Sequence, residues 1–326
     1  MLKLRLSLLA LASVFIVAST RLGAETFQEN FTTDPAARNW RAFGTASLFH
    51  WNSTNQNLEV TWDSAQPNSY FHRPLGTVLT KADDFSLAFD LRLQDVAARA
   101  DKSNAFQLAV GLIHWADATN AAFIRGSGYE SPNLVELDYF PASVFDATVA
   151  PTIISSNIQY ASSFNFPLEL TTGDLFHVVM SYTASNRTLA TTITRNGEPF
   201  GPVADAVQDS FFDDFRVDQL AINSYSEAGQ DPLYAGSIIA HGTVDNFVIT
   251  TPPPPVANLA GTRVNGHWQV QFDGQANWTY TLERTSDWQS WAAVSSTISG
   301  SRGQITLEHL NPPPDNGFYR VRAERP

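Results

Sequence analysis

Hydrophobic and polar positions alternate along several stretches of the chain, and the clearest stretch is residues 85–93. Its sequence, Phe-Ser-Leu-Ala-Phe-Asp-Leu-Arg-Leu, places a large apolar side chain at every odd position and a small or charged one at every even position. Successive side chains of a β-strand leave on opposite faces, so this pattern predicts a strand with one packed face and one wet face.

Further runs with the same period of two follow along the chain, separated by stretches rich in Gly, Asn, Asp and Pro. Many short strands at this spacing predict an antiparallel β-sandwich or barrel, and no long helical periodicity competes with them. The runs are Phe106–Leu112, Val135–Tyr139, Phe176–Tyr182, Phe215–Tyr225 and Thr243–Ile249.

One turn is specified by its sequence. Asn196-Gly197 lies between two β-rich flanks within residues 189–203. Both central residues of a tight two-residue hairpin turn need positive φ, and Asn followed by Gly adopts that conformation readily. The dipeptide therefore predicts a hairpin.

The run Thr251-Pro252-Pro253-Pro254-Pro255 predicts a linker, because consecutive prolines hold an extended, semi-rigid conformation. We place a large β domain at residues 25–251, the linker at 252–255 and a small β domain at 256–326. The expected strands of the small domain are Trp268–Phe272, Tyr280–Arg284 and Gly317–Arg322.

The N-terminus predicts a secretory signal peptide over residues 1–24. Lys3 and Arg5 precede an apolar run from Leu6 to about Ser19, and small residues follow at Gly23-Ala24. Arg21 interrupts the apolar stretch before it reaches the length of a membrane anchor. We therefore expect an exported protein, secreted, periplasmic or held at the cell surface, with no membrane insertion after cleavage.

Cysteine content and charge limit the kinds of site and the classes of partner that the chain can have. The chain has no cysteine, which excludes disulfides, thiolate metal sites and a lipid-bearing cysteine. Residues 25–251 carry 11 basic and 26 acidic residues, whereas residues 256–326 carry 6 of each. An acidic surface repels nucleic acid and anionic membranes, so a neutral polymer or a cation is the expected partner, unless the charge serves only solubility.

In the order of its pieces, the large domain resembles the concanavalin A-like lectin and glucanase superfamily. The pieces are Glu29-Asn30-Phe31, the strand 85–93, the Asn-Gly hairpin and the closing run 242–247. This resemblance spans residues 25–251 and implies an all-β jelly-roll sandwich of two curved sheets of six or seven strands. It also implies carbohydrate recognition on the concave face, as in a lectin.

Two segments resemble a narrower group. Residues 133–141 and 151–157 look like parts of an uncharacterised group of exported bacterial proteins, which implies no activity. The small domain resembles the immunoglobulin-like or fibronectin-type modules that end many secreted bacterial proteins. Such a module implies a spacing or attachment role.

Glu136 and Asp138 are two residues apart on a predicted strand, so both side chains leave the same face. Laminarinase-type glycoside hydrolases of the same fold carry Glu-x-Asp on a strand, followed by a second Glu as acid/base. This chain has Phe140 and Pro141 at the corresponding places. Retaining hydrolysis needs two carboxyl groups with divided roles, so we expect the pair to bind a glycan rather than to cleave one. Solvated acids on an exposed sheet remain the plain alternative.

Trp51 and Trp115 each stand beside a histidine and near polar residues, and flat aromatic rings pack well against the apolar faces of sugars. Each of these rings could equally belong to the hydrophobic core. Arg125 follows a strand-like run and would point into the same cleft or form a surface ion pair. The predicted ligand-binding set is therefore Glu136, Asp138, Trp51, Trp115 and Arg125.

The superfamily resemblance also implies a structural Ca²⁺. The oxygen ligands would come from Asp245 or Asn246 on the closing strand, or from Asp213 and Asp214. The histidines have no zinc-ligand spacing. No cofactor is expected with certainty.

Three functions remain open for the chain. The favoured one is a non-catalytic, lectin-like protein that binds a polysaccharide or another glycan. A glycoside hydrolase or polysaccharide lyase on the same fold is the second, and a structural or adhesive surface protein without a small-ligand site is the third.

Overall fold

The computed structural model describes residues 24–98, 107–123, 131–143, 146–227, 236–314 and 317–325. Residues 1–23 of the predicted signal peptide lie outside these ranges. Among the described residues, no helix is long and apolar enough to cross a membrane.

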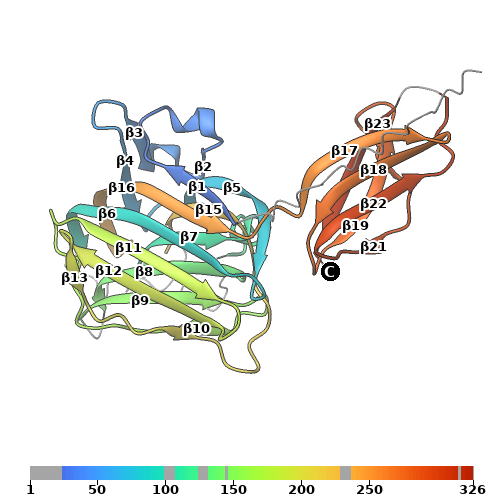
Figure 1. Ribbon diagram of the computed structural model, residues 1–326. Coiled ribbons are helices and arrows are strands. Elements are labelled where there is room, and N and C mark those ends of the chain that lie inside the picture. Colours follow the sequence, from blue (N-terminus) through green and yellow to red (C-terminus); the bar gives the residue numbers. More distant parts are fainter. Residues whose placement is uncertain are drawn as a thin grey trace, which may run out of the picture.

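Two antiparallel sheets pack face to face and form the large domain (Figure 1). In the described ranges the first sheet has nine strands, of which seven form one path and two pair at its side. The path is β13 (Glu198–Phe200), β12 (Thr188–Arg195), β11 (Phe176–Thr183), β6 (Phe85–Ala98), β16 (Ile238–Thr251), β4 (Asn57–Asp63) and β3 (Phe49–Asn52). The additional strands are β1 (Glu25–Glu29), which pairs with β16, and β14 (Ala206–Val207), which pairs with β12.

The second sheet of the large domain has seven strands within the described residues. Its order is β10 (Tyr160–Ser162), β9 (Asp146–Ile154), β8 (Leu134–Ser143), β7 (Leu108–Ile113), β15 (Arg216–Ser224), β5 (Ser69–Thr80) and β2 (Arg41–Phe43). Helical structure in these ranges is short: α1 (Trp115–Ala118) and the 3-10 turns Pro35–Arg38 and Ala46–Leu48. The predicted all-β jelly-roll sandwich is confirmed.

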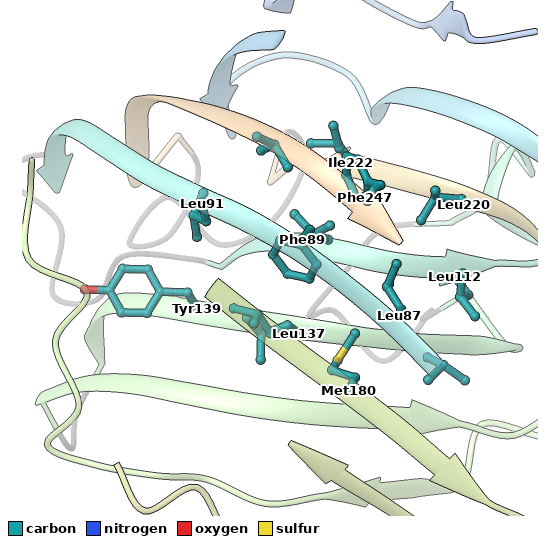
Figure 2. Close-up of a cluster of buried hydrophobic side chains, with 14 of the residues drawn as sticks. Leu87, Phe89, Leu91, Leu112, Leu137, Tyr139, Met180, Leu220, Ile222 and Phe247 are labelled. Carbon is teal, nitrogen blue, oxygen red and sulfur yellow. The ribbon is translucent and has the colours of Figure 1, made fainter. Parts of the chain in front are cut away.

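The alternation on β6 explains the main core. Its odd positions enter the space between the sheets, and Figure 2 shows them meeting side chains of the seven-stranded sheet. A buried Leu or Phe side chain stabilises the fold by about 1.5–3 kcal/mol relative to exposure, so this face holds the sheets together. The labelled core residues are Leu87, Phe89, Leu91, Met180 and Phe247 from the nine-stranded sheet and Leu112, Leu137, Tyr139, Leu220 and Ile222 from the other.

The predicted hairpin forms between β12 and β13. Arg195 pairs with Glu198 across a two-residue turn. Asn196 has φ 53° and Gly197 has φ 89°, as such a turn requires.

After β16 ends at Thr251, the small domain forms its own two antiparallel sheets around a separate core. One sheet is β17 (Val256–Val264), β18 (His267–Gly274) and β22 (Gly303–His309). The other is β20 (Ala292–Ala293), β19 (Thr279–Thr285), β21 (Ile298–Ser299) and β23 (Phe318–Glu324).

Arg325, directly after β23, joins the two domains. Its guanidinium donates to Asp83 Oδ1 over 2.6 Å and to Thr80 Oγ1 over 2.7 Å at the end of β5, and it lies 5.0 Å from the ring centroid of Trp278. On the linker side, the Tyr280 hydroxyl donates to the Pro255 carbonyl over 2.7 Å. We call these contacts of Arg325 the clasp, and they hold the small domain against the large one.

We expect Arg325→Ala to lower the free energy of unfolding of the large domain by about 3 kcal/mol, because Asp83 is buried and would lose its cation. The radius of gyration should rise as the domains separate. Urea denaturation and small-angle scattering measure both. Arg302→Ala, on the exposed side of the small domain, is the control, and an Arg325 variant that behaves like it would contradict a role for the clasp.

Candidate functional site

The outer face of the seven-stranded sheet carries the predicted carboxylates. On β8, Val135, Leu137 and Tyr139 enter the core between the sheets. Glu136 and Asp138 alternate with them and leave on the outer face. The two acids therefore share one face of the strand, as the sequence predicts.

Small residues surround the two acids on this face. Glu136 pairs with Gly111 on β7, and Asp138 pairs with Ala109 on β7 and Ala150 on β9. A Cβ atom at Gly111 would collide with the backbone of Glu136, so the close approach of β7 and β8 requires glycine there. The centre of the face is thus lined with short side chains.

Both carboxylates are buried, with exposed fractions of 0% for Glu136 and 1% for Asp138. Glu136 Oε2 accepts hydrogen bonds from the Tyr225 hydroxyl over 2.6 Å and from Asn223 Nδ2 over 2.9 Å. Asn223 Nδ2 also donates to the Tyr225 hydroxyl oxygen over 3.1 Å. The alternative of solvated acids on an exposed sheet is therefore wrong, because both carboxylates are buried and Glu136 lies in a buried polar network.

A second apolar cluster covers part of the same face. Tyr70, Phe123 and Tyr225 pack with smaller residues of β7, β9 and α1 on the outer side of the sheet. The Tyr70 hydroxyl donates to the carbonyl of Ala118 in α1 over 2.9 Å, which fixes the short helix over the sheet. The seven-stranded sheet is thus buried on both of its faces.

Trp115 lies at the β5–β2 edge of this outer face and is partly exposed. Its ring stacks on His72 at a centroid distance of 3.9 Å and meets Phe43 edge-on at 5.3 Å. The Trp115 backbone N–H donates to Asp218 Oδ1 over 2.9 Å, which anchors the start of α1. We call Phe43, His72 and Trp115 the Trp115 edge.

Burial lowers the pKa of His72 below its ordinary value, although its hydrogen bond with Gln219 acts in the opposite direction. Its Nδ1 atom lies 3.1 Å from Gln219 Oε1, and Arg41 on the neighbouring strand adds a further lowering effect. His72 is therefore neutral at pH 7 and presents a polar ring beside Trp115.

At the opposite edge of the sheet, beyond β10, a second group of aromatic rings is exposed. Phe164 is 59% exposed and its ring centroid lies 6.4 Å from that of Phe140 on the outer face of β8. Tyr160 is also exposed and pairs with Ile154, which faces the same side. We call Phe140, Tyr160 and Phe164 the Phe164 edge.

Sequence reasoning did not select Phe164. It stands in Ser163-Phe164-Asn165-Phe166, where polar and aromatic residues alternate directly after β10 and Asn165 forms an isolated bridge with Val149. That alternation was an available signal.

Trp51 does not join the acids. It lies on β3, at the edge of the nine-stranded sheet, and its ring packs against the core between the sheets. Its Nε1 atom donates to the Phe31 carbonyl over 2.8 Å. Trp51 therefore has a structural position, while Arg125 lies outside the described residues.

The predicted calcium ligands already accept or donate hydrogen bonds within the fold. Asp245 Oδ1 accepts from the Asn246 N–H over 2.7 Å, and Asn246 Nδ2 donates to Asp90 Oδ2 over 2.8 Å. Asp214 Oδ1 accepts from the backbone N–H of Lys81 over 3.0 Å. In the part of the chain that the structure describes, no group of three or more His, Asp or Glu residues is arranged to hold a metal ion.

The chain matches no protein-family profile and no curated protein sequence. Among solved structures it is similar to peanut lectin, with 15% identity and a TM-score of 0.45 over 70% of this chain and 99% of that one. It is also similar to a PL-14 alginate lyase from Aplysia kurodai, with 10% identity and a TM-score of 0.44 over 69% and 98% of the two chains. A legume lectin-like domain from Entamoeba histolytica gives 9% identity and a TM-score of 0.42 over 68% and 95%. These scores assign no ligand and no activity to this chain.

Tyr225→Phe removes the hydroxyl that donates to Glu136 inside the buried network. We expect the free energy of unfolding to fall by about 1–3 kcal/mol, since a buried acceptor loses a partner. Urea denaturation measures this loss, with Ser47→Ala, at an exposed hydroxyl, as the control. Equal stability of the two variants would show that the network does not support the fold.

Burial raises the pKa of Asp245 to about 6, and the nearby Asp90 and Glu29 act in the same direction. The folded state therefore binds a proton that the unfolded state releases at lower pH, so stability falls as the pH rises from about 4 to about 6. Asp245→Asn should remove this pH dependence. At pH 7 we expect its free energy of unfolding to be about 1 kcal/mol higher than that of the unchanged protein, after allowance for solvent screening. Denaturation from pH 4 to pH 7 tests it, and parallel curves for both proteins would contradict the shift.

Proposed function

We propose that the large domain binds a polysaccharide chain across the outer face of its seven-stranded sheet. The observation that supports this is the presence of exposed aromatic rings at both edges of that face, at the Trp115 edge and at the Phe164 edge. Between them the centre of the face is covered by the cluster of Tyr70, Phe123 and Tyr225, so a bound chain would pass over this cover. A ligand that contacts both edges must be extended.

The chemistry of the two edges suits sugars. Aromatic faces pack against the apolar C–H faces of pyranose rings, while His72, Gln219 and Arg41 offer polar groups for hydroxyls beside Trp115. The large domain is acidic, so an uncharged polysaccharide meets less repulsion than a polyanion.

In this proposal Glu136 and Asp138 act from beneath the surface. Glu136 holds Tyr225 and Asn223, and through them the apolar cluster that shapes the outer face. Arg125, which lies outside the described residues, remains a proposed ligand contact. The proposed function is non-catalytic. Hydrolysis needs two carboxyl groups at the glycosidic bond, and Glu136 and Asp138 are both buried away from a ligand on the surface.

A polysaccharide lyase is the second candidate, and His72 is the observation that favours it. A neutral imidazole can accept a proton, and Arg41 on the adjacent strand can bind a uronate carboxylate. Lyase products absorb near 235 nm because elimination forms a C=C bond conjugated to the carboxylate. Incubation with polyuronates should give no such absorbance if the domain only binds.

We further propose that the protein is exported through its signal peptide and works outside the cytoplasm. The small domain has the two-sheet organisation expected of an immunoglobulin-like or fibronectin-type module, which supports a role as spacer or attachment unit. Its charge is balanced, in contrast to the acidic large domain.

The test is native electrophoresis of the mature protein in gels that contain laminarin, xylan, galactomannan or alginate. We expect retardation by at least one uncharged polysaccharide, with apparent affinity about tenfold lower in Trp115→Ala and in Phe164→Ala. Val207→Ser, which changes an exposed apolar residue on the nine-stranded sheet, should leave the affinity unchanged.

Two results would overturn the proposal. Retardation of the double variant Trp115→Ala, Phe164→Ala that equals that of the unchanged protein would place binding elsewhere. A folded protein that none of the four polysaccharides retards would leave a structural or adhesive role as the working explanation. Circular dichroism of each variant confirms that the fold is intact.

A further inference from the structure

The small domain carries an exposed aromatic cluster that the proposed function of the large domain does not use. Trp288 is 62% exposed and Phe318 is 42% exposed. Their ring centroids lie 4.0 Å apart, and Trp291 meets Trp288 edge-on at 6.0 Å. Phe318 thus backs part of the Trp288 ring, and much of that indole is open to solvent.

The cluster stands on the outer side of the sheet that contains β19 and β23. Leu282 of β19 enters the core of the small domain, and its neighbours Glu283 and Thr285 leave on the other side. Thr285 pairs with Phe318, and Glu283 pairs with Arg320. The rings and the charged side chains therefore share one face.

The loop before β20 fixes the position of Trp288. The Thr285 hydroxyl oxygen accepts hydrogen bonds from the N–H groups of Asp287 and Trp288 at 3.2 Å and 3.0 Å. Asp287 Oδ1 accepts from those of Gln289 and Ser290 at 2.8 Å and 2.9 Å. These bonds lower the pKa of Asp287 and keep it ionised.

Trp288 has φ 62°, a left-handed conformation that is unfavourable for a bulky side chain. The surrounding hydrogen bonds offset this strain, which places a large apolar ring in solvent rather than in the core. The loop therefore preorganises the ring of Trp288 in the unbound protein.

The charges beside the rings nearly balance. Arg320 Nε donates to Glu283 Oε2 over 2.7 Å, and its guanidinium lies 4.2 Å from the centroid of Trp291. Arg322 lies 3.3 Å from Glu283 and 3.4 Å from Glu324. Two arginines and two glutamates cancel, and the ionised Asp287 beside Trp288 adds one negative charge. The surroundings of the rings therefore favour an uncharged partner over a polyanion, and its hydroxyl groups can accept from the remaining guanidinium N–H groups.

The exposed area is too small for a stable protein partner. The open parts of Trp288 and Phe318 amount to about 250 Å², given 150–250 Å² for a whole aromatic side chain. A specific protein interface needs about 800 Å² on each side, of which roughly 450 Å² is apolar, so the two rings supply about half of that apolar area. One sugar ring matches the available surface.

We propose that the small domain is a second, independent glycan-binding unit, in which Trp288 stacks on a pyranose ring of an uncharged polysaccharide and Arg320 binds its hydroxyls. The three rings are not coplanar, since Trp288 is tilted by 36° to Phe318 and by 77° to Trp291. The unit therefore recognises a sugar of a soluble chain and not the flat surface of a crystalline polymer.

The experiment uses the full mature chain in the Trp115→Ala, Phe164→Ala background and in the unchanged background. Affinity gels with laminarin, xylan and galactomannan, together with sedimentation with microcrystalline cellulose, supply the probes. We expect Trp288→Ala to reduce affinity for a soluble polysaccharide about tenfold or more in both backgrounds. Leu259→Ala, a similarly exposed apolar side chain on the other sheet of the small domain, should have no effect.

This design distinguishes failure of the second site from failure of the proposed function of the large domain. Binding lost only in the large-domain variants, with Trp288→Ala unchanged, overturns the second site and leaves the proposed function intact. Wild-type dimerisation at micromolar concentration that Trp288→Ala abolishes would also overturn it, in favour of contact between two copies of the chain. Sedimentation velocity measures the dimerisation. If the protein bound microcrystalline cellulose as tightly as soluble chains, the inference drawn from the non-coplanar rings would be contradicted.

Discussion

The fold depends on the pleat of the seven-stranded sheet, whose two faces are both buried. Because consecutive side chains on β8 leave on opposite sides, one strand supplies Val135 and Leu137 to the apolar core and Glu136 and Asp138 to the outer face. An apolar sandwich closes one side, and a polar network with an aromatic cover closes the other. Neither side tolerates a one-residue shift of register.

This arrangement separates the acids from the surface that a ligand can reach. A buried carboxylate needs donors, and Tyr225 and Asn223 supply them to Glu136. The accessible chemistry of the same face therefore lies at its edges, where Trp115 and Phe164 are not covered. Under the proposed function, a ligand of the large domain would contact the rings first, and Glu136 would act only through Tyr225 and Asn223.

Local patterns allowed much of this fold to be predicted, and long-range pairing explains what was missed. The strand at residues 85–93, the Asn196-Gly197 hairpin and the common face of Glu136 and Asp138 all follow from period and turn chemistry within a few residues. The burial of Glu136 depends on Tyr225, which is 89 residues away. Trp51 resembled a site residue by its neighbours in sequence, but the pairing of β3 with β4 places it in the other sheet.

The clasp at Arg325 has a consequence for the reach of the molecule. Because Arg325 is bonded to Asp83 and Thr80 across the junction, and Tyr280 holds the Pro255 end of the linker against the small domain, the linker does not act as a free tether. For a polymer held by one domain, the second domain would then be presented at a nearly fixed distance and direction. A fixed geometry raises the effective concentration of the second site for a polymer chain long enough to reach both sites. A shorter chain cannot reach both and gains no affinity from the second site. If both domains bind the same polymer, such a junction would select chains by length, independently of their sugars.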